Sequence, residues 1–434
     1  MNNHIKKMLR ITDDNLNLIS TEEANVNGMN TLIIKGTYSP MPSACKNCHS
    51  SIVDREGNSI IVKNGKKEVT IRLLPYQNLP TILKLKKQRF YCRKCCHHWT
   101  VQCSIVEKNC HISKFTTLKI LELLTEKISM TLIAKLCQVS LTTVLRVLKS
   151  VETQLPHQLK PRRFPEVLMV DEFRSHATNE DKMSFIYADG KTGELVDILP
   201  SRKLDKLTVY FNRTPLEERK KVKFLVTDMN AAYFQLTKKV FPTAGVIIDR
   251  FHVIKHLNTA FNEFRVREMK VLISENKKSE ANKLKTNWKF LLKNQLTISI
   301  SEFKTWRSFP SPKYPLLTES MMIDRLLSFS PNLKEAYDSF QLLTYHFRNK
   351  DADSFFELLK NLPNSLDRLF KDKLENLLAY ETGIRNALLY DFSNGKIEAK
   401  NTHIKTLKRV SYGFKSFSNM RIRIFLINGL IKIK

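Results

Sequence analysis

Two pairs of cysteines, each pair separated by two residues, constrain the N-terminal part of the chain more strongly than any other feature. Cys45 and Cys48 form the first pair, and Cys92 and Cys95 form the second. This spacing lets both thiolates of a pair point at one ion, and Zn²⁺ is held by four such ligands in a tetrahedron. Because β-like sequence joins the pairs, residues 1–110 are predicted to form a zinc ribbon around a structural Zn²⁺.

The fourth zinc ligand stays open in the sequence, because Cys96, His97 and His98 directly follow the second pair. Protein side chains would fill all four positions, which leaves no open site for water and makes the ion structural. The alternative is a group of reduced core cysteines. A redox pair is less favoured, since no thioredoxin-like βαβ pattern surrounds either pair. The three remaining cysteines are expected to be small core residues: Cys103, Cys110 and Cys137.

The charge of the chain is strongly positive, with 72 Lys and Arg against 42 Asp and Glu and a formal net charge of +30. Such an excess repels itself and suits a protein whose partner is a polyanion such as DNA. A basic protein without such a partner, or one that visits acidic membranes, is the alternative. No apolar run of about 18 residues is present, so a membrane span is not expected. The N-terminus lacks the apolar core of a secretory signal, and the protein is therefore expected in the cytoplasm, associated with the nucleoid.

Residues 111–155 are predicted to form a helix-turn-helix. Ile133, Ala134 and Leu136 can form the inner face of one short helix. The next residues would turn, with Ser140 as the N-cap of a second helix. In that second helix the expected inward residues are Val144, Leu145 and Leu148.

The outward side of the second helix would meet a DNA major groove. It carries four polar side chains: Thr142, Thr143, Arg146 and Lys149. An ordinary three-helix packing unit has the same apolar pattern and is the alternative. Residues 156–165 contain prolines and basic side chains and are predicted to be an extended linker.

From residue 166 the pattern changes to buried strands that alternate with helices. The expected elements are a strand at Val167–Val170, a hairpin of Met183–Ala188 and Glu194–Leu199, a helix at Leu204–Phe211, and strands at Val222–Val226 and Gly245–Ile248. Residues 259–380 are rich in helix formers and are expected to be a mostly helical insertion. The order is what an RNase H-like α/β core in two parts, residues 166–258 and 381–434, would show. The expected fold class is therefore multidomain α+β.

Three acidic residues far apart in the sequence are the candidate catalytic residues: Asp171, Asp228 and Glu398. The two aspartates end apolar runs, where side chains emerge at the rim of a sheet. Cleavage of a phosphodiester with two metal ions needs carboxylates that converge on ions about 3.5–4 Å apart. Hard oxygen ligands suit Mg²⁺ or Mn²⁺. A single strand-end aspartate is more often a cap or turn residue, so neither aspartate is specific alone.

Three neighbouring acids are expected to lie outside this site. Glu172 would point to the opposite face of its strand, and Asp189 lies in the hairpin turn. Asp197 sits in mid-strand and is expected to be solvated or ion-paired.

The segment Lys396–Arg409 is helical by pattern and has a basic face. The same side as Glu398 would carry Asn401 or Thr402, Lys405 and Arg409, and the buried side Ile397, Ile404 and Leu407. From Ala399 to Lys434 there are nine Lys or Arg and no acid. The candidate DNA contacts here are Lys405, Lys408 and Arg409. A solvated basic helix is the alternative, but it does not explain the absence of acids.

Five segments carry a family resemblance: Val170–Phe173, DGKTGELVDILPSR (189–202), TDMNAAY (227–233), DRFHVIKHLN (249–258) and SNGKIEAKNTHIKTLKRVSYGFKSF (393–417). Together with the zinc knuckles and the helix-turn-helix, they resemble the DDE transposases of bacterial insertion sequences, specifically the ISL3 family. The resemblance implies an RNase H-like core in which Asp171, Asp228 and Glu398 bind Mg²⁺ or Mn²⁺. It also implies that Asp249 and His252 support the site, although His252 can equally be an ordinary histidine at a helix start.

The resemblance implies cleavage and strand transfer of DNA during transposition. The expected partners are double-stranded DNA, as terminal inverted repeats and as target, and a second copy of the chain in a homodimer or higher oligomer. Two alternatives remain. One is a DNA-binding regulator derived from a transposase that no longer cuts. The other is a recombinase that needs no metal and uses a covalent tyrosine such as Tyr412.

Overall fold

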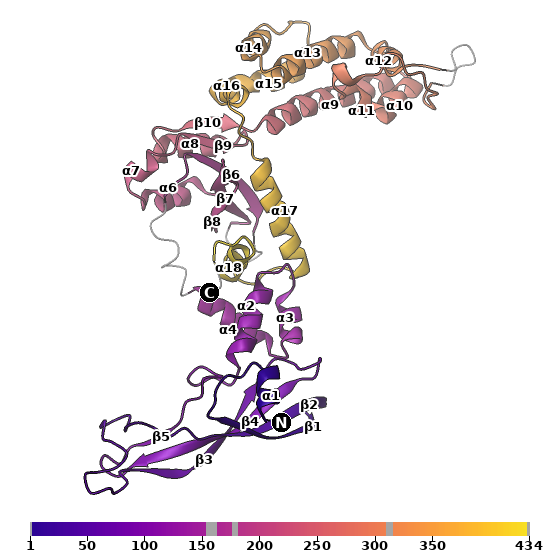
Figure 1. Ribbon diagram of the computed structural model, residues 1–434. Coiled ribbons are helices and arrows are strands. Elements are labelled where there is room, and N and C mark those ends of the chain that lie inside the picture. The colour runs from indigo at the N-terminus through magenta and orange to yellow at the C-terminus, as the bar shows by residue number, and fades with distance from the viewer. Residues whose placement is uncertain (1, 153–162, 176–180, 310–315, 432–434) are drawn as a thin grey trace. The chain divides into compact units, whose positions relative to one another are not determined.

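The computed structural model describes residues 2–152, 163–175, 181–309 and 316–431. The chain divides into two compact units, of which the first comprises Met1–Lys160 with His403–Lys434 and the second comprises Pro161–Thr402. Of the predicted linker at 156–165, positions 156–162 lie outside the described residues. Figure 1 labels the elements of both units.

The first unit begins with a sheet of five strands in the order β1-β2-β4-β3, with β5 paired to β4. Its elements are α1 (Asn2–Met8), β1 (Leu16–Val26), β2 (Met29–Tyr38), β3 (Ile61–Arg72), β4 (Thr81–Cys92) and β5 (His98–Thr100). Asn27 and Gly28 join β1 to β2 with φ of 54° and 83°, the backbone that a tight two-residue hairpin requires and that Asn-Gly adopts readily. Alternation along β4 buries Leu83 and Leu85, so one face of the sheet forms a core.

Three helices follow in the same unit: α2 (Lys114–Leu124), α3 (Met130–Leu136) and α4 (Leu141–Glu152). Ser140 caps α4 as predicted, because its Oγ accepts a hydrogen bond from the amide of Thr143 at 3.3 Å. The buried face of α4 contains Val144 and Leu148 as expected, but Leu145 is only half-buried. Leu136 was predicted to face inward and is 51% exposed; Ile133 and Ala134 already fill the inner face of the two-turn helix α3.

The C-terminal helix α18 (Phe417–Ile427) packs with α2 and α4. Its Arg423 is fully buried and donates hydrogen bonds to the backbone carbonyls of Leu124, Glu126 and Ile128. These carbonyls lie at and beyond the end of α2, where the helix leaves acceptors without partners. Burial lowers the pKa of Arg423 to about 10, so the guanidinium stays charged at neutral pH. One side chain thus joins the last helix to the helical bundle of its unit.

The second unit contains a mixed sheet of five strands in the order β10-β9-β6-β7-β8. The strands are β6 (Val167–Arg174), β7 (Met183–Asp189), β8 (Leu195–Leu199), β9 (Phe224–Thr227) and β10 (Gly245–Ile248). β6, β7 and β8 pair antiparallel, whereas β9 and β10 run parallel to β6. The predicted hairpin and all predicted strands are therefore present.

Helices cover this sheet and continue beyond it. Between the strands lie α6 (Leu204–Asn212), α7 (Leu216–Arg219) and α8 (Ala231–Val240). Side chains of α6 and α8, among them Phe211 and Tyr233, share a core with Phe185 and Leu225 of the sheet. Because these aromatic residues bury large areas, they fix the two helices on that face.

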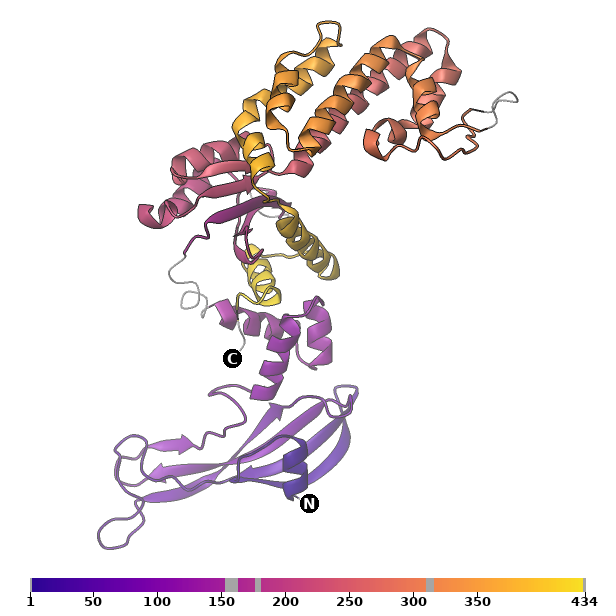
Figure 2. The same cartoon turned by 45° about the horizontal axis from the view of Figure 1, so that its top comes forward.

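The segment after β10 is helical, as its composition predicts. It contains α9 (Arg250–Ser274), α10 (Lys278–Thr286), α11 (Trp288–Leu291), η1 (Gln295–Thr297), α12 (Glu319–Leu327), α13 (Pro331–Arg348), α14 (Ala352–Lys360), α15 (Arg368–Glu375), η2 (Asn376–Tyr380), α16 (Glu381–Leu389) and α17 (Gly395–Val410). Figure 2 shows α13 alongside α9. Trp306 packs against this helical core, and its Nε1 donates to the carbonyl of Leu317 at 2.9 Å.

In the described part of the chain, no single helix is long and apolar enough to cross a membrane. Taken together, α3 and α4 have the length and apolar composition of a membrane span, but they are bent by 111° at their junction.

Candidate functional site

The four predicted cysteine ligands lie together in the first unit. The sulfur atoms of Cys45, Cys48, Cys92 and Cys95 all lie within 4.8 Å of one another. The Sγ–Sγ distance is 3.6 Å between Cys45 and Cys95 and 3.7 Å between Cys48 and Cys92. A tetrahedron with Zn–S bonds of about 2.3 Å has sulfur atoms about 3.8 Å apart. The cluster therefore fits one structural Zn²⁺.

The surroundings of the sulfurs shift their pKa values in different directions, down for Cys48 and up for Cys92. Hydrogen bonds from the hydroxyl and the amide of Ser50 lower the pKa of Cys48 to about 6. Cys96 is exposed and lies outside the cluster, whose fourth sulfur is that of Cys95. Cys103 and Cys137 are buried as predicted, whereas Cys110 is exposed and the expectation of a core residue was wrong there.

Three aspartates of the second unit stand in one row across its parallel strands. β9 pairs with β6 through Val226 and Met169, so continuing the register by two residues places Asp228 beside Asp171. β10 pairs with β9 through Ile248 and Thr227, which places Asp249 on the other side of Asp228. Adjacent strands are about 4.8 Å apart. The row therefore brings three carboxyl groups to one edge of the sheet.

Asp171 differs from the expectation in one respect: β6 does not end there but continues to Arg174. β7 supports the extra residues as an antiparallel neighbour. β9 ends at Thr227, so Asp171 and Asp228 lie beyond the region where their two strands pair.

Burial and the charges of neighbouring acids act on Asp171 and Asp228. Burial raises the pKa of Asp171 to about 6, and the charges of Asp228 and Glu398 add to this rise against hydrogen bonds from the Glu172 amide and Asn401. Burial also raises the pKa of Asp228, while His252 opposes the rise. Half-buried carboxylates whose pKa values are raised by burial and by neighbouring acids lack sufficient positive charge. A divalent cation is the species that such a set of hard oxygen donors would hold.

Glu398 on α17 also belongs to a second group, in which ligand atoms of Asp249, His252 and Glu398 lie within 4.8 Å of one another. His252 Nε2 is 3.8 Å from Glu398 Oε1. Both oxygens of the buried Asp249 accept backbone hydrogen bonds, from Phe251 at 3.1 Å and from Asn394 at 3.3 Å. Asp249 is thus the N-cap of α9, which orients the first turn that carries His252.

Asn401 is a residue of this site that the sequence analysis assigned differently. It was expected, as one of two options, on the basic face of α17, but it is only 5% exposed. Its Nδ2 donates to Asp171 Oδ2 at 2.6 Å and to the carbonyl of Glu172 at 3.3 Å. Its spacing of four from the buried Ile397 is the signal that could have placed it on the inner side.

Of the three neighbouring acids, Asp189 lies in the hairpin turn as expected, whereas Glu172 is near enough to the site for its charge to raise the pKa of Asp228. The Glu172 carboxylate pairs with Arg202 and accepts hydrogen bonds from Asn230 at 3.1 Å and Tyr233 at 2.7 Å. Asp189 accepts a hydrogen bond from the amide of Lys191 in the hairpin turn at 2.7 Å.

Asp197 was expected to be solvated or ion-paired, and the structure contradicts the solvated alternative. Its side chain is fully buried and accepts a hydrogen bond from the hydroxyl of Tyr210 at 2.5 Å. A buried carboxylate with such a donor is satisfied within the fold.

The residues predicted to contact DNA are accessible. Thr142, Arg146, Lys149, Lys405 and Arg409 are exposed, and Thr143 and Lys408 are half-buried.

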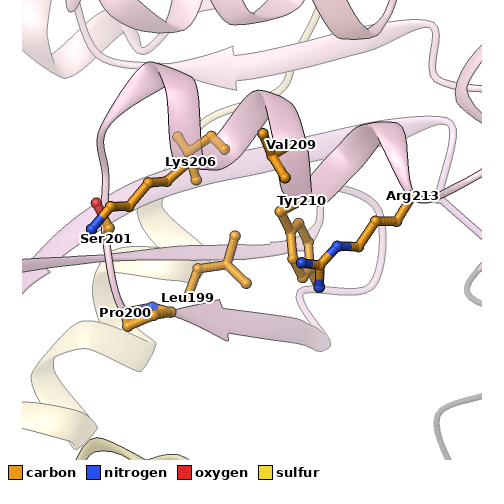
Figure 3. A pocket seen from close by; sticks show the side chains of 8 residues that line it. Leu199, Pro200, Ser201, Lys206, Val209, Tyr210 and Arg213 are labelled. Carbon is orange, nitrogen blue, oxygen red and sulfur yellow. The ribbon is translucent and has the colours of Figure 1, made fainter.

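A hollow of about 230 Å³ lies between the end of β8 and α6. Its rim includes Lys206 and Arg213, with Leu199, Pro200 and Tyr210 below them (Figure 3). None of the predicted site residues lines it.

The fold and the two clusters define a multidomain α/β protein with a zinc ribbon and an acidic row suited to a divalent cation. Comparison with known protein families identifies the family to which the chain belongs. Residues 168–424, more than half of the chain, match the profile of the ISL3 family described as "Transposase". Residues 57–95, which include the second cysteine pair, match the "zinc-finger of transposase IS204/IS1001/IS1096/IS1165". The chain belongs to the ISL3 family of transposases.

A curated protein of Lactococcus lactis subsp. lactis, named "ATP-dependent protease", is 40% identical over 116 residues. The match covers 26% of this chain and 36% of that protein. The chain therefore spans about a third of the length of this relative.

Proposed function

We propose that the chain is a DDE transposase that cleaves and joins DNA strands with Mg²⁺ or Mn²⁺ held by Asp171, Asp228 and Glu398. The observation that carries the proposal is the alignment of Asp171 with Asp228 across paired strands, with Glu398 near enough for its charge to raise the pKa of Asp171. Carboxylates in this arrangement are what two-metal cleavage of a phosphodiester requires.

The strand arrangement supports an RNase H-like catalytic core. Three antiparallel strands, β6 to β8, are followed by two strands parallel to β6, each preceded by a helix. Helices α9 to α16 then separate Asp249 from Glu398. This is the order in which the sequence analysis expected the core and its insertion.

The side chains around the carboxylates have distinct roles in this proposal. Bound metal would activate the attacking water or 3′-hydroxyl and stabilise the leaving oxygen. The amide of Glu172 and the side chain of Asn401 each donate to one oxygen of Asp171, which fixes the orientation of a carboxylate that would bind metal through its remaining lone pairs. Asp249 fixes the start of α9, and His252 beside Glu398 can orient the glutamate.

The first unit would bind the transposon ends. α3 and α4 are bent by 111°, and four residues separate them, as in a helix-turn-helix whose second helix enters the major groove. In this proposal Thr142, Thr143, Arg146 and Lys149 meet inverted repeats, while Lys405, Lys408 and Arg409 neutralise phosphates. Two ends must be brought together for strand transfer, so a homodimer or higher oligomer on DNA follows. The protein would act in the cytoplasm, at the nucleoid.

The test is nicking of supercoiled plasmid by the full chain with Mg²⁺ or Mn²⁺. Asp228→Asn and Glu398→Gln are expected to lower the rate at least about 100-fold, as loss of a charged group at the reacting phosphate does. Asp205→Asn, which changes an exposed carboxylate in the first turn of α6, is the matched control and should retain the rate. Nicking that survives either site substitution contradicts the assignment.

The alternatives give different results in the same experiment. A regulator that no longer cuts would bind DNA and show no nicking with either metal. A tyrosine recombinase would act in EDTA, leave a protein–DNA adduct and lose activity in Tyr412→Phe.

A further inference from the structure

Tyr412 occupies an unusual backbone position at the end of α17. The amide of Gly413 donates to the carbonyl of Lys408 at 2.9 Å, and the amide of Tyr412 donates to that of Arg409 at 3.1 Å. These two bonds define a Schellman motif, whose left-handed residue is usually Gly. Here that residue is Tyr412, with φ of 51°. A bulky side chain in this conformation is strained, and such strain points to a function of the side chain.

The ring of Tyr412 is also 97% exposed. A Tyr buries a large apolar area when it packs, and packing within the fold therefore does not explain its presence. The backbone holds the ring in the solvent on a short, hydrogen-bonded turn.

Tyr412 stands at the edge of a hollow of about 600 Å³ within the first unit, here called the Tyr412 hollow. Its lining includes apolar side chains of α3, α4 and the turn before α18, namely Met130, Leu132, Leu145 and Phe414. Lys135 and Lys415 stand on the same lining and are exposed. The volume admits a planar ring, and the two ammonium groups suit an anion attached to that ring.

The charge around the Tyr412 hollow indicates which kind of partner would bind there. From Ala399 to Lys434 the chain has nine Lys or Arg and no acid. An apolar hollow with a protruding aromatic ring and a basic rim matches an unpaired nucleobase and its phosphate, because bases stack on aromatic side chains and phosphates release counterions to Lys.

We infer that Tyr412 stacks on an unpaired base of a DNA end, with the base over the Tyr412 hollow and its phosphate near Lys135 and Lys415. The inference rests on the proposed function and adds a contact that reads an opened DNA end rather than the duplex. Stacking needs the ring but not its hydroxyl, so the role differs from that of a covalent tyrosine.

The experiment compares two labelled duplexes in magnesium-free buffer, where no cleavage occurs, by fluorescence anisotropy. Both carry the same short 3′ overhang, one with adenines and the other with abasic nucleotides, so their phosphate charges are equal. The full chain is expected to bind the adenine overhang on the order of tenfold more tightly, as base–aromatic stacking predicts.

Tyr412→Gly should bring this ratio to about one, whereas Tyr412→Phe should retain it. Gly relieves the positive-φ strain, so the melting temperature of Tyr412→Gly should not fall, and a loss of folding cannot explain the result. Gln138→Gly is the matched control, because Gln138 has φ of 52° at the end of α3 in the same unit. It should leave the ratio unchanged.

Equal binding of both overhangs by the unaltered chain, or an unchanged ratio in Tyr412→Gly, overturns the inference. If neither the unaltered chain nor any variant bound the duplex, the result would instead contradict the proposed function. Failure of the inference and failure of the proposed function are therefore distinguishable.

Discussion

Replacing Asp171 by Asn is expected to stabilise the metal-free protein while removing its response to magnesium. The pKa of Asp171 rises from 3.8 to about 6 on folding, mainly through burial and then through the charges of Asp228 and Glu398. At about 1.4 kcal/mol per pKa unit, ionised Asp171 disfavours the folded state by about 3 kcal/mol at neutral pH.

The stabilisation of the folded state by Asp171→Asn is smaller than this electrostatic penalty, because Asn cannot accept both hydrogen bonds that Asp171 accepts. The Asp171 oxygens accept from the Glu172 amide at 2.7 Å and from Asn401 at 2.6 Å. Losing one of them costs about 1 kcal/mol. The net stabilisation by Asp171→Asn is therefore about 2 kcal/mol at pH 7.5.

The sign of the pH dependence follows from the raised pKa. The folded state favours the protonated carboxyl, so the penalty is absent well below pH 3.8, grows as pH rises and is complete above about pH 6. At pH 4.5 the remaining penalty of about 1 kcal/mol equals the lost hydrogen bond. At this pH the unaltered chain and the Asp171→Asn variant should therefore be equally stable.

Urea unfolding followed by tryptophan fluorescence measures this difference. A Trp99→Phe background leaves Trp288 and Trp306 as reporters of the second unit, since the chain has three Trp. Magnesium-free buffer without a chelator keeps the structural zinc in place. Mg²⁺ at 100 times its Kd should stabilise the Asp171 protein by about 2.7 kcal/mol and the Asn variant much less. No advantage for the variant at pH 7.5, or the same advantage at pH 4.5, refutes the reasoning.

Two further predictions follow from single contacts. Asn401→Ala should raise the magnesium concentration for half-maximal plasmid nicking by about tenfold or more, because Asn401 orients a ligand, and an unchanged metal requirement would remove Asn401 from the site. Cys95→Ser should release zinc and unfold the ribbon, whereas Cys96→Ser should retain one zinc per chain by metal analysis, because Cys96 is exposed and outside the cluster; equal zinc contents in the two variants would contradict the ligand assignment.

Features with a strict local spacing could be predicted from the sequence. The two-residue spacing of Cys45/Cys48 and Cys92/Cys95 predicted the cysteine cluster, with only the fourth ligand left open. The apolar run Gly245–Ile248 matches β10 residue for residue. In both cases a short sequence pattern is enough for the prediction. Two residues between cysteines suit the coordination of one metal ion, and a short apolar run indicates a buried strand.

Residues whose environment depends on distant segments could not be predicted in the same way. Asp197 is buried because Tyr210 of another element supplies its hydrogen bond. Asn401 faces inward because Asp171, far away in the sequence, accepts from it. A helical pattern gives the face of such a residue only within about one position, and that error separates the basic face of α17 from its buried side.

The same limit applies to the C-terminal helix. In the sequence, Arg423 is one more cation in a basic segment. In the structure it is buried and donates hydrogen bonds to backbone carbonyls just beyond the end of α2. Only the tertiary structure distinguishes such a residue from a DNA contact.

The most direct test of the central claim is to locate the metal by replacing Mg²⁺ with Fe²⁺ and generating hydroxyl radicals with ascorbate and peroxide. Three carboxylates around shared ions predict cuts of the protein backbone near residues 171, 228 and 398 together, suppressed by excess Mg²⁺ and lost in Asp228→Asn. Cuts confined to one of these positions, or their persistence in the variant, would contradict a common metal site.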